Sequence, residues 1–179
     1  MLEPSGVEAY RLGRDYAVMP IAMVPEHCVE VPAGPVVFVV EARSLSQEAI
    51  VANEAGQDAS DGLVHDYDVD AAGASLHVVG ACDGLEYLRF DAFDAEPHYH
   101  YIHNDVPQNT VVRIDDVAEG DPLAWTLRVV GNRLPELLVH AHAPGLAEEV
   151  RARSDEVAAG FAKLEPLLRR AEAKANALR

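Results

Sequence analysis

Two histidines with one residue between them, His98 and His100, are the strongest chemical feature of this sequence. They lie in the run PHYHYIHND at positions 97–105, which holds three of the eight histidines. Alternate side chains of a β-strand point to the same face, about 7 Å apart. Two imidazoles placed in this way can converge on one small ion or one polar ligand. The spacing therefore predicts either a metal site or an acid–base site on this strand.

A nearby carboxylate would complete a set of two histidines and one carboxylate, which suits Fe(II), Mn(II) or Zn(II). Asp105 follows His100 by five residues, and Asp91 lies on the preceding predicted strand. We predict His98, His100 and Asp105 as metal ligands, with Asp91 as the alternative carboxylate or as the group that orients a ring. The His-x-His spacing resembles that of the cupin metalloproteins, although the glutamate, glycine and later histidine of their pattern are missing here.

The same residues also support chemistry without a metal. An imidazole oriented by Asp91 can act as a general acid or base near neutral pH. Tyr67, Tyr87 or Arg89 can stabilise a negative charge that develops on an oxygen atom. The candidate catalytic residues are His100, Asp91, Arg89 and Tyr87.

Turn signals predict how the strands pair on either side of these residues. A two-residue turn at Asp83-Gly84 places Val78 opposite Arg89. A loop at positions 94–97 places Asp91 opposite His100.

This pairing predicts two faces of different chemistry. One face collects His65, Tyr67, Tyr87, Arg89, Asp91, His98 and His100, and the other carries Leu88, Phe90, Tyr99 and Tyr101. The polar face is either exposed to water or the lining of a cavity. For a cavity, the candidate ligand-binding residues are His65, Tyr67, Tyr99 and Tyr101.

The hydrophobic pattern places these residues in an antiparallel sheet. An apolar run at 36–40 predicts a buried strand, and alternating patterns predict strands at 63–69, 75–80, 85–93, 98–103, 110–115 and 123–130. Turn residues at 70–73 predict a hairpin. Apolar residues at helical spacing predict one long C-terminal helix at 146–178, kinked at Pro166.

We therefore expect an α+β fold, a curved antiparallel meander of about six or seven strands packed against the long C-terminal helix. The order of elements is similar to that of the helix-grip fold, which implies a curved sheet around the helix and a ligand cavity. A small barrel is the alternative. The Pro-rich residues 1–35 are predicted to form an N-terminal arm, and residues 36–179 a single domain.

Composition argues against several classes of partner. The 179 residues carry a formal net charge of −16, with a pI of about 4.7, which argues against nucleic acids and anionic membrane surfaces. No apolar run reaches the roughly 18 residues that a membrane span needs, and no signal peptide is apparent. Cys28 and Cys82 form no Cys-x-x-Cys pair. We expect reduced thiols in a cytoplasmic protein, with a single disulfide as the alternative.

These observations predict small-molecule binding at the face that carries His98 and His100. The first hypothesis is a metal-dependent enzyme in which an aspartate completes or orients the ligands. The second is a ligand-binding protein without a metal. The third is a non-catalytic homo-oligomer, a homodimer being the commonest such form, whose histidine face is exposed to solvent. The hypotheses differ in whether a metal binds and in whether this face is buried.

Overall fold

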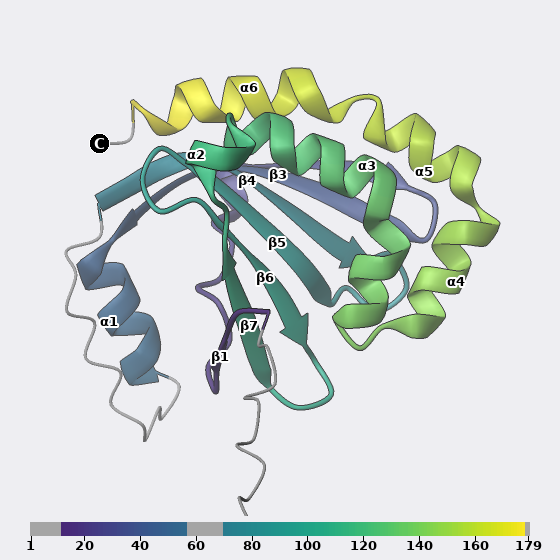
Figure 1. The fold of residues 1–179 in the computed structure, drawn as a ribbon, viewed down its shortest axis with the longest axis horizontal. Helices are drawn as coiled ribbons and strands as arrows, with labels where there is room; N and C mark the ends of the chain where they lie inside the picture. Colours follow the sequence, from purple (N-terminus) through teal and green to yellow (C-terminus); the bar gives the residue numbers. More distant parts are fainter. Residues whose placement is uncertain (1–11, 57–69, 178–179) are drawn as a thin grey trace, which may run out of the picture.

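The structure is a computed structural model that describes residues 12–56 and 70–177, and it shows an α+β fold (Figure 1). Seven antiparallel strands within the described residues form one sheet in the order β1-β7-β6-β5-β4-β3-β2. The strands are β1 (Arg14–Tyr16), β2 (Cys28–Ala33), β3 (Val36–Ser46), β4 (Asp70–Gly80), β5 (Glu86–Phe93), β6 (His98–His103) and β7 (Gln108–Arg113). The predicted fold class is confirmed, but the sheet stays open, so the barrel alternative is wrong.

Helices lie on both faces of this sheet. They are η1 (Pro25–His27), α1 (Gln47–Gly56), α2 (Asp116–Glu119), α3 (Pro122–His140), α4 (Pro144–Ala152), α5 (Ser154–Phe161) and α6 (Leu164–Ala175). α3 contacts β5, and α6 crosses β3 and β4, whereas α1 lies apart from both helices (Figure 1). None of the helices in the described part of the chain has the length and apolarity needed to cross a membrane.

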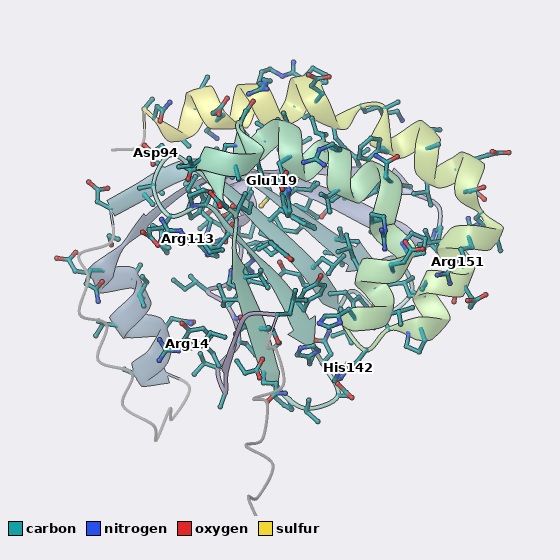
Figure 2. All side chains as sticks on the ribbon, in the orientation of Figure 1. Arg14, Asp94, Arg113, Glu119, His142 and Arg151 are labelled. Atoms are coloured by element: carbon teal, nitrogen blue, oxygen red, sulfur yellow. The ribbon has the colours of Figure 1, made fainter. Side chains whose placement is uncertain are left out.

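The two faces of the sheet differ in chemistry, and side chains fill the space on both sides (Figure 2). The face under α3 and α6 carries the apolar core, which includes Phe38, Leu76, Leu88, Phe90 and Tyr99. The opposite face carries buried polar side chains, namely Glu41, Ser75, His77, Arg89, Asp91 and His100. Alternate residues of a strand point to opposite faces, so β5 and β6 contribute to both. The predicted division of β5 and β6 into a polar and an apolar face is confirmed for residues 88–91 and 98–101.

Residues 123–130, predicted as a strand, form the first half of α3. Asp121 caps this helix, because its Oδ1 accepts a 3.0 Å hydrogen bond from the backbone N–H of Leu123. Pro122 occupies the first turn, where its missing N–H leaves no bond unmade. The β-branched and aromatic residues of this segment favour strands, but the helix buries its apolar positions as one stripe.

The hairpin predicted at positions 70–73 is wrong, because these residues lie inside β4. Gly73 pairs with Arg43 on β3 and with Phe93 on β5. A Cβ on residue 73 would lie 2.9 Å from the Cα of Phe93. Glycine therefore permits a close approach of two strands here and does not form a turn. The strand predicted at 63–69 lies outside the described residues.

The single helix predicted at 146–178 is three helices within the described residues, α4, α5 and α6. The breaks fall at Arg153 and at positions 162–163. The predicted kink at Pro166 is wrong, because this proline lies in the first turn of α6 and removes no helical hydrogen bond. The breaks let α4 contact α3, α5 contact β2, and α6 contact β3 and β4.

The Pro-rich segment at 1–35 contributes to the sheet. β1 pairs with β7, and β2 pairs with β3 over its whole length. Cys28, at the start of β2, and Cys82 are both free thiols. The separation of an N-terminal arm from the domain stays a prediction.

A close contact between α5 and β2 provides a test of the packing. A Cβ added at Gly160 would overlap the Cβ of Ala33 and lie 3.1 Å from the carbonyl oxygen of Pro32. We expect Gly160→Ala to lower the free energy of unfolding by about 1–3 kcal/mol, because overpacking outweighs the better helix propensity of alanine. The control is Gly145→Ala in α4, where an added Cβ would have no atom within 4 Å. This substitution should raise the free energy of unfolding by up to about 1 kcal/mol. Urea unfolding measures both, and equal effects would contradict the close contact.

Candidate metal centre

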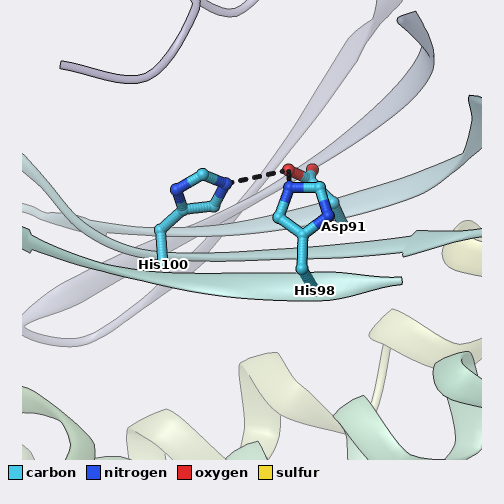
Figure 3. A group of neighbouring side chains, drawn as sticks. All are labelled: Asp91, His98 and His100. Atoms are coloured by element: carbon cyan, nitrogen blue, oxygen red, sulfur yellow. Dashed lines mark ion pairs between the residues drawn. The ribbon is translucent and has the colours of Figure 1, made fainter. Parts of the chain in front are cut away.

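The side chains of Asp91, His98 and His100 meet on the polar face of the sheet (Figure 3). β5 and β6 run antiparallel, with Asp91 opposite His98 and Arg89 opposite His100. One potential ligand atom from each of the three residues lies within 4.8 Å of the others. Asp91 is 3% exposed and His100 is 8% exposed, whereas the side chain of His98 is 19% exposed, so the group is largely but not fully sheltered from bulk water.

The predicted pairing of Asp91 with His100 is wrong by two residues. β6 begins opposite Asp91, so residues 92–97 separate the paired positions of β5 and β6, although Ala92 and Phe93 still pair with β4. Side chains alternate with a period of two, so a shift of two residues keeps every side chain on its predicted face. Asp91, His98 and His100 therefore come together despite the different pairing.

Hydrogen bonds fix the tautomer of both imidazole rings. The Nδ1 of His98 lies 2.7 Å from the carbonyl oxygen of Glu96, which can only accept, so this Nδ1 carries the hydrogen. The Nδ1 of His100 lies 2.8 Å from the Oδ1 of Asn109. The Nδ2 of Asn109 donates to the carbonyl oxygen of Val18 at 2.5 Å, which confirms the orientation of the amide. In their neutral forms, both rings therefore have an unprotonated Nε2.

Both Nε2 atoms face the same carboxylate oxygen. The Oδ2 of Asp91 lies 3.3 Å from the Nε2 of His98 and 3.3 Å from the Nε2 of His100, as the dashed lines mark (Figure 3). The other oxygen, Oδ1, accepts a hydrogen bond from the hydroxyl of Ser75. Ligand atoms bound about 2.0–2.2 Å from one ion stand about 3.0–3.5 Å apart, which matches the two nitrogen–oxygen separations.

The three side chains shift one another's pKa values. Burial raises the pKa of the Asp91 carboxyl, but the two imidazoles beside it, His100 and His98, outweigh burial and hold this pKa well below its usual value. Burial lowers the pKa of His98, yet its contacts with Asp91 raise the pKa above the ordinary value. Burial lowers the pKa of His100, and Asp91 does not fully offset this because the charge of His98 lies beside it. Asp91 is thus an anion, and His100 favours the neutral, metal-binding form.

A cavity of about 330 Å³ opens beside the three side chains. This volume lies at the lower end of the range of about 300–1,000 Å³ for small-molecule sites. Its apolar wall comes from residues 18–21, from Leu45 at the end of β3 and from Ile50 on α1. Arg89, Asp91, His98 and His100 line the sheet side of the cavity. We call this cavity the triad pocket.

Beside the pocket, five side chains form a buried series of salt bridges and hydrogen bonds, which we call the charge chain. It runs Arg43, Glu41, His77, Glu86, Arg89, with successive contacts of 2.7, 3.2, 2.6 and 2.7 Å. Burial raises the pKa of Glu86, but Arg89 and His77 outweigh burial and hold it far below its usual value. Arg43 and Arg89, at the two ends of the charge chain, both donate hydrogen bonds to the carbonyl oxygen of Ile21, at 3.0 and 2.7 Å. The charge chain therefore holds the wall at 18–21 over the pocket.

The turn and a β-bulge set which residues of β4 join this chain. The turn spans positions 81–84, and past Val78 the register shifts, so Tyr87 has no paired residue on β4. The predicted pairing of Val78 with Arg89 is wrong for this reason, because Arg89 lies opposite His77. His77 therefore shares the polar face, where it contacts two carboxylates.

The same bulge removes Tyr87 from the candidate site. Its hydroxyl donates a 2.7 Å hydrogen bond to Asp83, and its ring packs against the apolar core. Glu86 takes the place predicted for Tyr87 and binds Arg89 through both carboxylate oxygens, at 2.8 and 2.7 Å. Alternation along the sequence does not reveal this exchange, because a bulge interrupts the period of two.

The other predicted site residues lie elsewhere. The structure brings Asp91 and not Asp105 to the histidines, because β6 continues to His103 and the following turn carries Asp105 to the exposed Nδ1 of His142, 2.9 Å away. Tyr99 and Tyr101 are buried in the core beneath α3, where their rings contact Trp125 and His140, respectively. His65 and Tyr67 lie outside the described residues. Sequence reasoning missed Glu41, Ser75, Glu86 and Asn109, which come from four different strands.

A family model described as a domain of unknown function (DUF7700) matches residues 30–175, which is more than half of the chain. The matched segment contains Asp91, His98 and His100, and the pocket wall at 18–21 precedes it. Neither the comparison with curated proteins nor the comparison with solved structures found a match.

The charge chain predicts a pH-dependent stability. We expect Glu86→Gln to lower the free energy of unfolding at pH 7 by about 3–5 kcal/mol, because it leaves the buried guanidinium of Arg89 without its main counter-charge. The folded-state pKa of Glu86 is depressed, so its contribution is fully present above the unfolded pKa of about 4.3 and is lost as the pH falls below it.

Urea unfolding of the wild type and of Glu86→Gln at pH 7 and at pH 4 measures this contribution. The difference between the two proteins should shrink at the lower pH. Glu149→Gln on the exposed face of α4 is the matched control and should change stability by less than about 0.5 kcal/mol. A pH-independent difference would contradict the role assigned to Glu86.

Proposed function

The chain belongs to the DUF7700 family, and we propose that it is a metal-dependent enzyme whose Asp91, His98 and His100 bind a divalent transition metal ion beside a small-molecule pocket. One observation carries the proposal. Each imidazole uses its Nδ1 hydrogen on an oxygen acceptor, so both Nε2 lone pairs are directed toward one oxygen of Asp91. Three acceptor atoms that converge in a sheltered place require a positive charge between them.

A metal ion satisfies all three atoms, whereas one proton serves only two of them. A proton on one Nε2 could bond to Asp91, but the second Nε2 would still face the carboxylate with a lone pair. The separations of 3.3 Å exceed the 2.7–2.9 Å or so of a charge-assisted N–H···O bond. They agree with the spacing of ligands on a shared ion.

The ligand set favours certain metals and leaves coordination positions open. Two imidazoles and one carboxylate suit Fe(II), Mn(II) or Zn(II). Structural zinc sites use four protein ligands, and catalytic sites use three and keep a place for water or substrate. A metal here would supply Lewis-acid or water-activating chemistry at the wall of the triad pocket.

The residues around the ligands hold their geometry. Asn109 fixes the ring of His100, the Glu96 carbonyl fixes the ring of His98, and Ser75 fixes the carboxylate of Asp91. Outer partners of this kind set the orientation and basicity of metal-binding side chains. The apolar wall at 18–21 and Ile50 excludes water from a ligand bound beside them.

A second candidate is a ligand-binding protein without a metal. The observation that favours it is the contact of His98 with Asp91, which raises the pKa of His98 despite burial. A protonated His98 would then supply the positive charge, and the pocket would bind its ligand through hydrogen bonds. Metal titration separates the two candidates.

The central prediction concerns metal affinity. We expect the untagged, chelator-treated protein to bind one zinc, manganese or ferrous ion per chain, measured by calorimetry and by elemental analysis after dialysis. Asp91→Asn should weaken metal binding by more than about 100-fold, because it removes the anionic ligand. Loss of a residue that only orients a ligand typically weakens binding by about 10–100-fold, and loss of a ligand should cost more. Asp105→Asn is the matched control, since Asp105 is also an aspartate beside a histidine, and it should leave affinity unchanged. Equal affinity of the two variants, or no binding by the wild type, would contradict the proposal.

A separate prediction tests the tautomer of His100. Asn109→Ala should lower metal affinity by about 10–100-fold, because it removes the acceptor that directs Nε2 toward Asp91. Asn109 also holds the wall at 18–21, so the control is Asn53→Ala, which removes a 3.1 Å hydrogen bond to Met19 of the same wall. Calorimetric titration should show a loss in the first variant that is at least several-fold larger than in the second. Equal losses would assign the effect to the wall.

A further inference from the structure

The triad pocket concentrates positive charge in an acidic protein. Four of the fourteen basic residues of the chain line this one cavity, although the net charge is −16. They are Arg14, Arg43, Arg89 and Arg113. Two carboxylates, Asp91 and Glu96, line it with them. This distribution is opposite to that of the chain as a whole.

The four arginines fall into two classes. Arg43 and Arg89 are buried, bind Glu41 and Glu86, and donate to the Ile21 carbonyl, so their guanidinium groups are already occupied. Arg14 is exposed and stacks on Tyr16, with its guanidinium carbon 5.2 Å from the ring centroid. No ion pair to Arg14 occurs among the residues that the structure describes.

Arg113 is held only weakly. Its Nη2 lies 3.3 Å from an oxygen of Glu96, and both side chains are more than half exposed. Exposed pairs of this kind contribute little, so a ligand can compete for the guanidinium. Both Arg14 and Arg113 are labelled in Figure 2, in the region between α1 and β7.

The sheet register sets how far these arginines lie from the metal ligands. Arg113 pairs with His98 across β6 and β7, so their backbones are about 4.8 Å apart. Arg14 pairs with Val111, which in turn pairs with His100, so Arg14 and His100 are two strands apart, about 10 Å. A small molecule can therefore contact the triad at one end and an arginine at the other.

Charge balance favours a negative ligand. Glu41 and Glu86 neutralise the two buried arginines, Arg43 and Arg89, which we call the inner arginines. Asp91 and Glu96 balance the two outer ones, Arg14 and Arg113. A divalent ion at the triad would leave two positive charges in excess. The wall at 18–21, Leu45 and Ile50 offers apolar side chains to a ligand. The carbonyl oxygens of Val18, Met19 and Ile21 already accept hydrogen bonds from Asn109, Asn53 and the inner arginines, respectively.

We propose that the triad pocket selects an organic carboxylate, whose acidic group binds Arg14 and Arg113 and whose apolar body packs against the wall at 18–21. The inference deepens the proposed function and rests on it for the excess charge of the metal-loaded form. Arginine binds carboxylates through two parallel hydrogen bonds, which gives both affinity and orientation. Arg14 is therefore a specificity-determining residue.

The test uses phenylpropanoate and its neutral amide, which have the same shape and differ in charge. Calorimetry or ligand-observed NMR measures their binding to the full chain, both zinc-loaded and chelator-treated. We expect the acid to bind at least about tenfold more tightly than the amide. Arg14→Gln should reduce this preference several-fold and leave zinc affinity unchanged. Arg128→Gln, which removes an exposed charge on α3, is the control and should leave the preference intact.

The outcomes separate this proposal from the metal proposal. If zinc does not bind, the proposed function fails. The carboxylate proposal is still supported if the metal-free protein prefers the acid over the amide and Arg14→Gln loses that preference. If zinc binds but the acid and the amide bind equally well, the carboxylate proposal is overturned and the metal site stands. A preference that Arg14→Gln and Arg113→Gln both leave intact would also overturn it.

Discussion

The site depends on two hydrogen bonds at Nδ1, from His98 to the Glu96 carbonyl and from His100 to Asn109. Each bond commits the only hydrogen of a neutral ring to an oxygen that must accept it. Both Nε2 atoms are then left to face one oxygen of Asp91; Asp91 and His100 are buried, and His98 is partly buried. A set of acceptors without donors is unfavourable in a buried place, and this group could hold a cation. The wall at 18–21 and four arginines line the pocket beside it.

The rest of the fold offsets the free-energy cost of burying a polar face of the sheet. One face of the sheet packs on α3 and α6 through a continuous apolar core, which supplies the main favourable free energy of folding. On the other face, the buried charges of Glu41 and Arg89 pair with Arg43 and Glu86, and His77 contacts both carboxylates. Unpaired, either charge would destabilise the sheet strongly. Paired, they hold the wall at 18–21 over the site through the Ile21 carbonyl.

The features that the sequence predicts correctly are local ones. The alternation in residues 88–91 and 98–101 determines which side chains share a face, and a shift of two residues in pairing does not alter that. The carboxylate that joins the two histidines depends on where β6 ends: the strand continues to His103, so Asp105 turns away and Asp91 completes the group. Glu41, Ser75 and Asn109 reach the site from β3, β4 and β7, and pairing between strands distant in the sequence has no local signal. Residues 123–130 show the converse, since strand-favouring side chains form a helix where capping and burial favour it.

The most direct test of the account is the position of the ion itself. Crystals of the zinc-loaded protein, measured at the zinc absorption edge, give an anomalous difference map that locates the metal independently of any assumed ligand. The account predicts one strong peak between the Oδ2 of Asp91 and the Nε2 atoms of His98 and His100. A peak beside Asp105 and His142, or zinc bound through Nδ1 of either ring, would contradict it.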